Sequence, residues 1–333
     1  MIPPDSASPR PRVPASDPAE PLGVQLGPLR LKNPIVTASG TFGYGLEFTD
    51  FVDLSRLGGI CTKGLSLKPH AGNAPPRICE TPAGMLNAIG LQNVGVDVFL
   101  RKKLPRLREL NVTVIANVWG DVEEDYVAVV RALEEEPGLA AIELNISCPN
   151  VEKGGMLFGN SPAATASLVA RVRAATRRPL IVKLSPNAPD LVLSARAARE
   201  AGADVLSLVN TFVAMAIDPE TAVPRVSFGT GGLSGPAIKP LAVRMVFQVA
   251  RALPGVPIMG IGGISDLADV LEFLAAGAAA VQVGTANFKE PGVSGRLVEE
   301  LTAFCGRRGV SVPALVGRAH ARGGSRLDAG GEG

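Results

Sequence analysis

Short apolar segments recur along the chain, and each stops at a polar residue or a glycine. This pattern is typical of strands that run through a buried core and open into loops. We therefore predict eight strands, within residues 33–40, 58–64, 112–120, 140–150, 179–187, 203–211, 256–264 and 278–288.

Segments with helical periodicity lie between the predicted strands. We expect an amphipathic helix in each of YVAVVRALEEE, SLVARVRAAT, LVLSARAAREAG, PLAVRMVFQVARAL and LADVLEFLAAGA. Alternating strands and helices of this number predict an α/β fold, a parallel (β/α)8 TIM barrel. The alternative is a doubly wound open sheet, which usually has fewer strands and a GxGxxG turn after its first strand. The first strand here ends in ASGTFGYG, which does not match that turn.

The segments outside the strand–helix alternation predict how the barrel is bounded. VQLGPLRLKNP reads as an N-terminal β-hairpin that turns at Gly27-Pro28 and closes the barrel floor. The connections 65–95 and 211–236 are too long for simple turns, and long loops at the top of a barrel usually cover a site. We expect a disordered tail over 1–21, the barrel over 22–310 and a disordered C-terminal extension over 311–333.

Composition narrows the classes of function. The chain has 333 residues, 46% of them hydrophobic, which is ample for a sizeable core. A formal net charge of +2 gives no indication of a nucleic-acid or membrane-surface partner, and no apolar run reaches membrane-spanning length. The four cysteines, at 61, 79, 148 and 305, form no metal-like cluster, so we expect no metal site and a reducing, cytoplasmic location.

Polar residues and glycines mark the predicted strand ends. In a parallel barrel all carboxyl ends meet at one mouth, so these residues should share one cavity. Together they are hard to explain as packing, because an unpaired buried polar group costs ~1–3 kcal/mol. The glycine pairs in GIGGIS and VGTANF, after the last two strands, favour a phosphate site. The strand-end residues are Ser39, Lys63, Asn117, Asn145, Lys183, Asn210, Gly262, Gly263, Gly284 and Thr285.

Cys148, in ELNISCPN, follows a predicted strand directly and is a candidate general base. The chain has only two histidines, His70 and His320, so histidine, the residue most often used for proton transfer, is scarce. A buried structural cysteine is the plainer reading of Cys148, and we assign that role to the other three cysteines. Lys183 has an alternative of its own, because barrel aldolases use a strand-end lysine to form a Schiff base.

The motifs resemble one family throughout residues 22–310. They are NPIVTASGTFGYG, CTKG, ETPAGMLNAIGLQNVGVD, ELNISCPNVEKGG, VKLSPN, VNTFVAMAID, GTGGLSGPAIKPLAVRM, GIGGI and DVLEFLAAGAAAVQVGTANF. In order and in length they resemble the catalytic subunits of class 1B dihydroorotate dehydrogenases, bacterial flavoenzymes of pyrimidine (UMP) biosynthesis. The resemblance implies oxidation of (S)-dihydroorotate to orotate, with hydride transfer to one FMN per chain.

Trp119 departs from the family, which more often has a small residue there, and we expect it to reshape the pocket near Asn117.

The resemblance also implies roles for individual residues, with Cys148 as the general base. It places FMN on Ser39, Lys63, Gly64, Asn117, Asn145, Lys183, Val209, Gly235, Gly262, Gly263, Gly284 and Thr285. It places dihydroorotate on Lys63, Asn87, Ala88, Ile89, Gly90, Leu91, Asn145, Asn210 and Thr211. Asparagine offers both a donor and an acceptor, which suits an amide-edged ring.

The resemblance finally implies how electrons leave. An iron–sulfur cluster needs about four clustered cysteines, and the cysteines here are scattered. We therefore expect FAD and an iron–sulfur cluster on a partner subunit that delivers electrons to NAD+, in a heterotetramer of two barrels and two partner subunits. The alternatives are a fumarate-linked dihydroorotate dehydrogenase or a barrel like that of dihydropyrimidine dehydrogenase.

Overall fold

The computed structural model of the chain describes residues 20–146 and 155–321. Eight parallel strands close into a barrel in the order β10-β13-β14-β3-β4-β7-β8-β9, which confirms the predicted (β/α)8 architecture. Each strand falls in one of the predicted segments, apart from the first residue of β8. The strands are β3 (Ile35–Thr37), β4 (Gly59–Cys61), β7 (Val114–Val118), β8 (Leu139–Asn145), β9 (Leu180–Lys183), β10 (Val205–Leu208), β13 (Ile258–Ile261) and β14 (Ala280–Val283).

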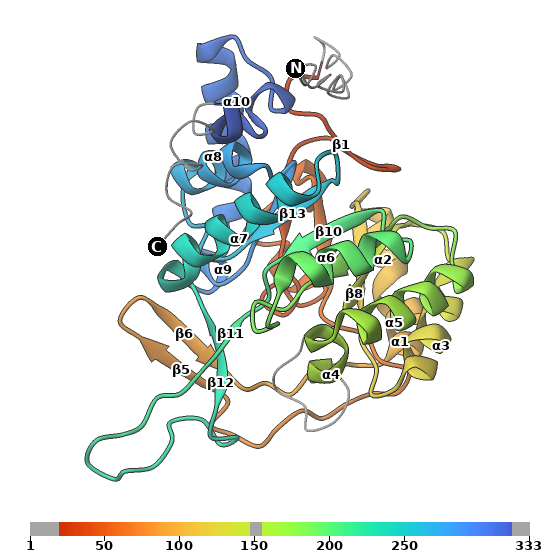
Figure 1. The fold of residues 1–333 in the computed structure, drawn as a ribbon, viewed down its shortest axis with the longest axis vertical. Helices are drawn as coiled ribbons and strands as arrows, with labels where there is room; N and C mark the ends of the chain where they lie inside the picture. The colour runs from red at the N-terminus through yellow and green to blue at the C-terminus, as the bar shows by residue number, and fades with distance from the viewer. Residues whose placement is uncertain (1–19, 147–154, 322–333) are drawn as a thin grey trace, which may run out of the picture.

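Helices surround the barrel, and five of them match the predicted amphipathic segments (Figure 1). These are α3 (Glu123–Glu134), α5 (Pro162–Ala175), α6 (Leu191–Glu200), α7 (Lys239–Ala252) and α8 (Leu267–Ala276). Local chemistry sets their ends: the Asp266 carboxylate caps the start of α8, and Gly277 ends it in the left-handed conformation. The other helical segments are α1 (Val96–Val98), the π-helical turn η3 (Phe99–Lys103), α2 (Leu104–Glu109), α4 (Gly155–Asn160), α9 (Ala286–Lys289) and α10 (Val293–Arg308).

The strand–helix alternation fails after β3. Between β3 and β4 the chain forms two short 3-10 turns in place of an α-helix, η1 (Leu46–Phe48) and η2 (Leu54–Arg56). Gly45 has φ +88°, and a Cβ on it would lie 2.7 Å from Ile60 Cδ1. The segment therefore lies directly against the barrel wall, too close for a helix with side chains between.

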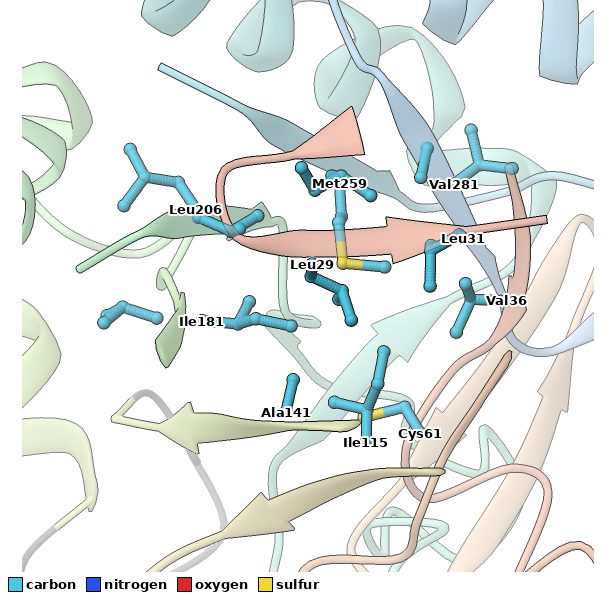
Figure 2. Close-up of a cluster of buried hydrophobic side chains, with 14 of the residues drawn as sticks. Leu29, Leu31, Val36, Cys61, Ile115, Ala141, Ile181, Leu206, Met259 and Val281 are labelled. Atoms are coloured by element: carbon cyan, nitrogen blue, oxygen red, sulfur yellow. The ribbon is translucent and has the colours of Figure 1, made fainter. Parts of the chain in front are cut away.

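The N-terminal hairpin closes the barrel floor as predicted. Strands β1 (Val24–Leu26) and β2 (Leu29–Leu31) are antiparallel, and each buries its outer residues while exposing its middle one. Figure 2 shows Leu29 and Leu31 beside apolar side chains that come from all eight barrel strands. The hairpin thus supplies the side chains that fill the bottom of the barrel.

The two long connections together form a four-stranded antiparallel sheet that the sequence did not predict. Its order is β11-β12-β6-β5, and it projects from the barrel in Figure 1. One connection contributes β5 (Ile78–Thr81) and β6 (Gly84–Asn87), and the other contributes β11 (Phe212–Ala214) and β12 (Gly231–Ser234). We call this sheet the loop sheet. It joins segments far apart in sequence beside the barrel mouth.

The C-terminal extension differs from the expectation of disorder in its first part. A 3-10 turn, η5 (Pro313–Leu315), follows Val312, and both Val312 and Leu315 are buried in the main core. The His320 ring stacks on Phe247 with centroids 4.1 Å apart, and its Nε2 lies 2.9 Å from the Ala276 carbonyl oxygen. Residues 311–321 therefore belong to the barrel domain, while 1–19 and 322–333 lie outside the described residues. Within the described ranges, no helix is long and apolar enough to cross a membrane.

The floor hairpin yields a stability prediction. Leu31 is 1% exposed, so Leu31→Ala should lower the free energy of unfolding by ~2–5 kcal/mol through lost burial and a residual cavity. The matched control is Arg30→Ala on the same strand, whose side chain is 63% exposed and pairs with Glu20 at the surface. That change should cost under ~1 kcal/mol. Urea unfolding measures both, and equal losses would contradict the floor assignment.

Candidate active site

A cavity of about 470 Å³ lies at the barrel mouth, a size typical of cofactor and small-molecule sites. The strand-end residues converge on it as the parallel topology predicts. The cavity is lined by eighteen of the residues to which the resemblance assigns a role. These are Ser39, Lys63, Gly64, Asn87, Ile89, Gly90, Leu91, Asn117, Asn145, Lys183, Val209, Asn210, Thr211, Gly235, Gly262, Gly263, Gly284 and Thr285.

Two of the sequence-predicted residues do not join this set. Ala88 is fully buried beneath the loop sheet, where it packs with Leu86 and Val226 rather than lining the cavity. Its neighbour Asn87 lines the cavity, which agrees with the alternation of side chains in an extended segment. Cys148 falls within 147–154 and lies outside the described residues, so its role stays a prediction.

Two lysines contribute positive charge to the cavity. Lys183 ends β9 and is buried, and its Nζ donates to Ser39 Oγ at 3.3 Å. Lys63 follows β4, and burial lowers the pKa of its ammonium, with the nearby positive charge of Arg77 acting in the same direction. Glu47 raises the pKa of Lys63 and so opposes both effects. The arrangement suits a negatively charged ligand, which would relieve the cost of holding two cations together.

Asparagine amides form a second group on the cavity wall. Asn210 Nδ2 donates to Asn145 Oδ1 at 3.1 Å, and Asn87 Nδ2 donates to the Gly232 carbonyl oxygen at 3.2 Å across the loop sheet. The Tyr126 hydroxyl donates to the Asn145 carbonyl oxygen at 2.9 Å and so holds the end of β8. These contacts position donors and acceptors for a ligand with amide edges.

A fully buried carboxylate, Glu143, was missed by the sequence reasoning. It accepts hydrogen bonds from Asn117 Nδ2 at 2.7 Å, Ser207 Oγ at 2.8 Å, Gln282 Nε2 at 2.6 Å and Cys61 Sγ at 3.1 Å. Burial raises the pKa of the Cys61 thiol well above its usual range, and the charge of Glu143 adds to this, so Cys61 stays protonated and donates. The signal was present in IELN, because a charge inside a buried strand is rare unless it is paired.

Two glycines after β13 bring backbone without side chains to the cavity wall. Gly262 has φ +131° and Gly263 φ +75°, both unfavourable for other residues. A Cβ on Gly263 would lie 2.8 Å from Lys239 Cβ and 2.9 Å from the Gly235 carbonyl oxygen. Gly284 and Thr285, after β14, line the same cavity. Backbone exposed in this way, at the last two strands of a barrel, is typical of a phosphate site.

Trp119 lies next to Gly64, which lines the cavity. Its indole is buried, Nε1 has no hydrogen-bond partner within the described residues, and its ring meets His70 edge-on at 5.4 Å. A Cβ on Gly64 would lie 3.0 Å from Trp119 Cδ1 and 3.0 Å from Asn117 Oδ1. Trp119 therefore restricts the space beside Asn117 while standing behind the wall.

The fold and the site define a class of protein: a (β/α)8 barrel whose mouth combines lysines, amides and glycines in one cavity, an arrangement typical of enzymes that bind a phosphate-bearing cofactor. Among residues 20–146 and 155–321, no three His, Cys, Asp or Glu side chains gather as a metal site. The family model for dihydroorotate dehydrogenase matches residues 22–305, so the chain belongs to the dihydroorotate dehydrogenase family.

Similar proteins agree with this assignment. The chain is 54% identical over 297 residues to a protein of Trichlorobacter lovleyi and to one of Geobacter sulfurreducens, with 89% of this chain and 97% of each relative covered. It is 54% identical over 295 residues to a protein of Pelobacter propionicus, covering 88% and 97%. All three are named dihydroorotate dehydrogenase B (NAD(+)), catalytic subunit.

The charges around Lys63 predict the direction in which its pKa shifts when each is removed. Arg77→Gln removes a positive charge that disfavours the ammonium, so the pKa of Lys63 should rise. Glu47→Gln removes the opposing negative charge and should lower it. The pH dependence of Lys63 acetylation, followed by mass spectrometry, reports both changes. Shifts of the same sign in the two variants would show that these charges do not act on Lys63.

Proposed function

We propose that this chain catalyses the FMN-dependent oxidation of (S)-dihydroorotate to orotate in pyrimidine biosynthesis. Family membership and the names of its relatives support dihydroorotate oxidation. The observation that carries the proposal is one cavity that holds Lys63, Lys183, the asparagine amides and the glycine cradle. These groups suit a ring substrate with a carboxylate and amide edges, next to a cofactor with a phosphate.

The cavity wall fits FMN. Gly235, Gly262 and Gly263 line the cavity, and close packing against their neighbours leaves no room for a Cβ, so a backbone without side chains is available there and suits the FMN phosphate. Asn117 Oδ1 is buried without a partner in the described part of the chain, as expected for an acceptor that meets a ligand. Lys183 would balance negative charge on the reduced ring. When bound, FMN supplies the hydride acceptor.

The substrate would meet the remaining polar groups. Lys63 is suited to the carboxylate of dihydroorotate, and the amides of Asn87, Asn145 and Asn210 are suited to its ring amide and imide. The contact between Asn210 and Asn145 fixes the two amides relative to each other. Because their orientation is set before the substrate arrives, less conformational entropy is lost on binding.

Cys148 would remove the proton alpha to the carbonyl. It follows the end of β8 by three positions, and Asn145 at that end lines the cavity. A thiol has an unperturbed pKa of ~8.5, so a thiol base favours activity on the alkaline side of neutral.

The direct test of the proposed reaction is anaerobic mixing of the FMN-loaded chain with dihydroorotate. Reduction should bleach the flavin absorbance and produce orotate in equal amount. Bound FMN that stays oxidised would contradict the proposal.

The assignment of the base makes a separate prediction. Cys148→Ala should bind FMN and orotate normally but reduce the flavin ~10²–10⁴-fold more slowly at pH 7. Cys148→Ser should recover activity only at higher pH, since a hydroxyl is a far weaker acid than a thiol. Cys79→Ala on the loop sheet is the control and should react like wild type. Stopped-flow absorbance measures the rates, and a wild-type rate in Cys148→Ala would overturn the assignment.

We further infer that electrons reach NAD+ through a partner subunit with FAD and an iron–sulfur cluster, in a heterotetramer of two barrels and two partners. The relatives' name, catalytic subunit, supports a second subunit for those proteins. The free cysteines of the described residues lie on β4, β5 and α10, separate elements that suit no shared cluster. Free thiols also fit the reducing cytoplasm.

The electron route can be tested by reconstitution. The isolated chain should reduce artificial dyes with dihydroorotate but reduce NAD+ negligibly, and adding the partner should restore NAD+ reduction. The rates are followed by absorbance with NAD+, fumarate and quinone supplied separately. Rapid NAD+ reduction by the chain alone, or fumarate reduction at a comparable rate, would show that the electron route is different.

A further inference from the structure

The Glu143 carboxylate is saturated with donors. Its Oε1 accepts from Asn117 Nδ2 and Cys61 Sγ, and its Oε2 accepts from Ser207 Oγ and Gln282 Nε2. A carboxylate offers about four acceptor positions, so these contacts use its capacity. The donors come from β4, β7, β10 and β14, while Glu143 itself stands on β8.

This saturation determines which way the Asn117 amide faces. Because both oxygens of Glu143 accept, Asn117 turns its NH2 group toward Glu143 and its Nδ2 donates to Oε1. Its carbonyl oxygen, Oδ1, then faces away and has no partner among the described residues, although it is fully buried. Leaving such an acceptor unpaired costs ~1–3 kcal/mol, which a ligand donor would recover. Asn117 is nevertheless one of the residues that line the cavity.

The space beside that oxygen is kept open by a glycine. A Cβ on Gly64 would lie 3.0 Å from Asn117 Oδ1 and 3.0 Å from Trp119 Cδ1. Any side chain at 64 would therefore be pressed against the acceptor. With glycine at 64, which itself lines the cavity, no side chain fills the space beside this oxygen.

We propose that Glu143 is a positioning residue that holds Asn117 with its carbonyl oxygen toward the cavity, where it accepts a hydrogen bond from a ring imide N–H of the bound ligand. The inference rests on the proposed function, because FMN and dihydroorotate both carry an imide N–H. Glu143 touches neither of them and acts through the orientation of one amide.

The proposal is tested by exchanging the amide and the carboxylate between positions 117 and 143. Asn117→Asp places a carboxylate against Glu143, and at pH 8.5 the like charges should displace the side chain and weaken ligand binding about a hundredfold. Glu143→Gln alone should change the affinity less than about threefold, because the Ser207 hydroxyl and the Gln282 amide can both turn to accept. In the double variant the amide introduced at position 143 donates to the carboxylate introduced at position 117, and affinity should return to within about tenfold of Glu143→Gln.

Two ligand titrations distinguish the source of the imide. FMN binding to the cofactor-free chain is followed by flavin fluorescence, and orotate binding to the FMN-loaded chain is followed by flavin absorbance. Loss and rescue of FMN affinity would assign the imide to the cofactor, and loss and rescue of orotate affinity alone would assign it to the substrate. If neither affinity falls in Asn117→Asp, or if Glu143→Gln fails to rescue it, the proposal is overturned.

A matched control and a second readout separate positioning from folding. Gln282→Glu brings the same like charge to the other oxygen of Glu143, but Gln282 does not line the cavity. It should lower the unfolding temperature while leaving FMN affinity within about threefold of wild type. The unfolding temperatures of the cofactor-free Asn117 and Glu143 variants should show the same loss and rescue without any ligand. Failure of FMN to bind wild type would therefore count against the proposed function, while those temperatures would still decide the Glu143–Asn117 contact.

Discussion

Closure of eight parallel strands sorts the interior of the barrel into levels, because alternate residues of one strand face the same side. On β8, Ala141 belongs to the floor cluster of Figure 2, Glu143 lies in the closed interior and Asn145 lines the cavity. On β9, Ile181 lies in the floor cluster and Lys183 in the cavity. The hairpin closes the floor of the barrel, so polar groups are needed only toward its mouth. The position of every strand-end residue follows from this ordering.

Burial of polar groups costs free energy in the layer between the floor cluster and the cavity, which holds Glu143. A buried carboxylate is costly unless hydrogen bonds compensate it, and four strands bring donors to Glu143. Satisfying Glu143 leaves the carbonyl oxygens of Asn117 and Gln282 without partners in the described structure. Stability is thus lost at two acceptors, and one of them belongs to Asn117, which lines the cavity. Polar groups that are incomplete without a ligand are expected where a site is built for binding rather than for stability.

The sequence predicted the barrel because each strand is a local signal: an apolar run that stops at a polar residue. It predicted the cavity residues because parallel topology alone brings strand ends together, and the family resemblance extended the set. It could not predict the loop sheet, since β6 pairs with β12 across about half the length of the barrel sequence, as in the pair of Leu86 with Leu233. The burial of Ala88 outside the cavity lining could not be foreseen for a related reason, because it depends on Val226 from the distant connection. The turns after β3 depend on how closely Gly45 approaches Ile60, which no periodicity records.

The residues that line the cavity come from two parts of the fold, the closed barrel and the long connections. Lys183, Asn117 and the glycine pair at 262–263 stand on or directly after barrel strands, which hydrogen bonds hold on both sides around the closed ring. Asn87 and Thr211 belong to the long connections, whose sheet has free edges at β5 and β11. Groups on the closed ring suit a cofactor that stays in place, whereas groups on a projecting sheet can change without disturbing the barrel. Substrate preference can therefore diverge between barrels of this kind while the proposed cofactor end of the site is kept.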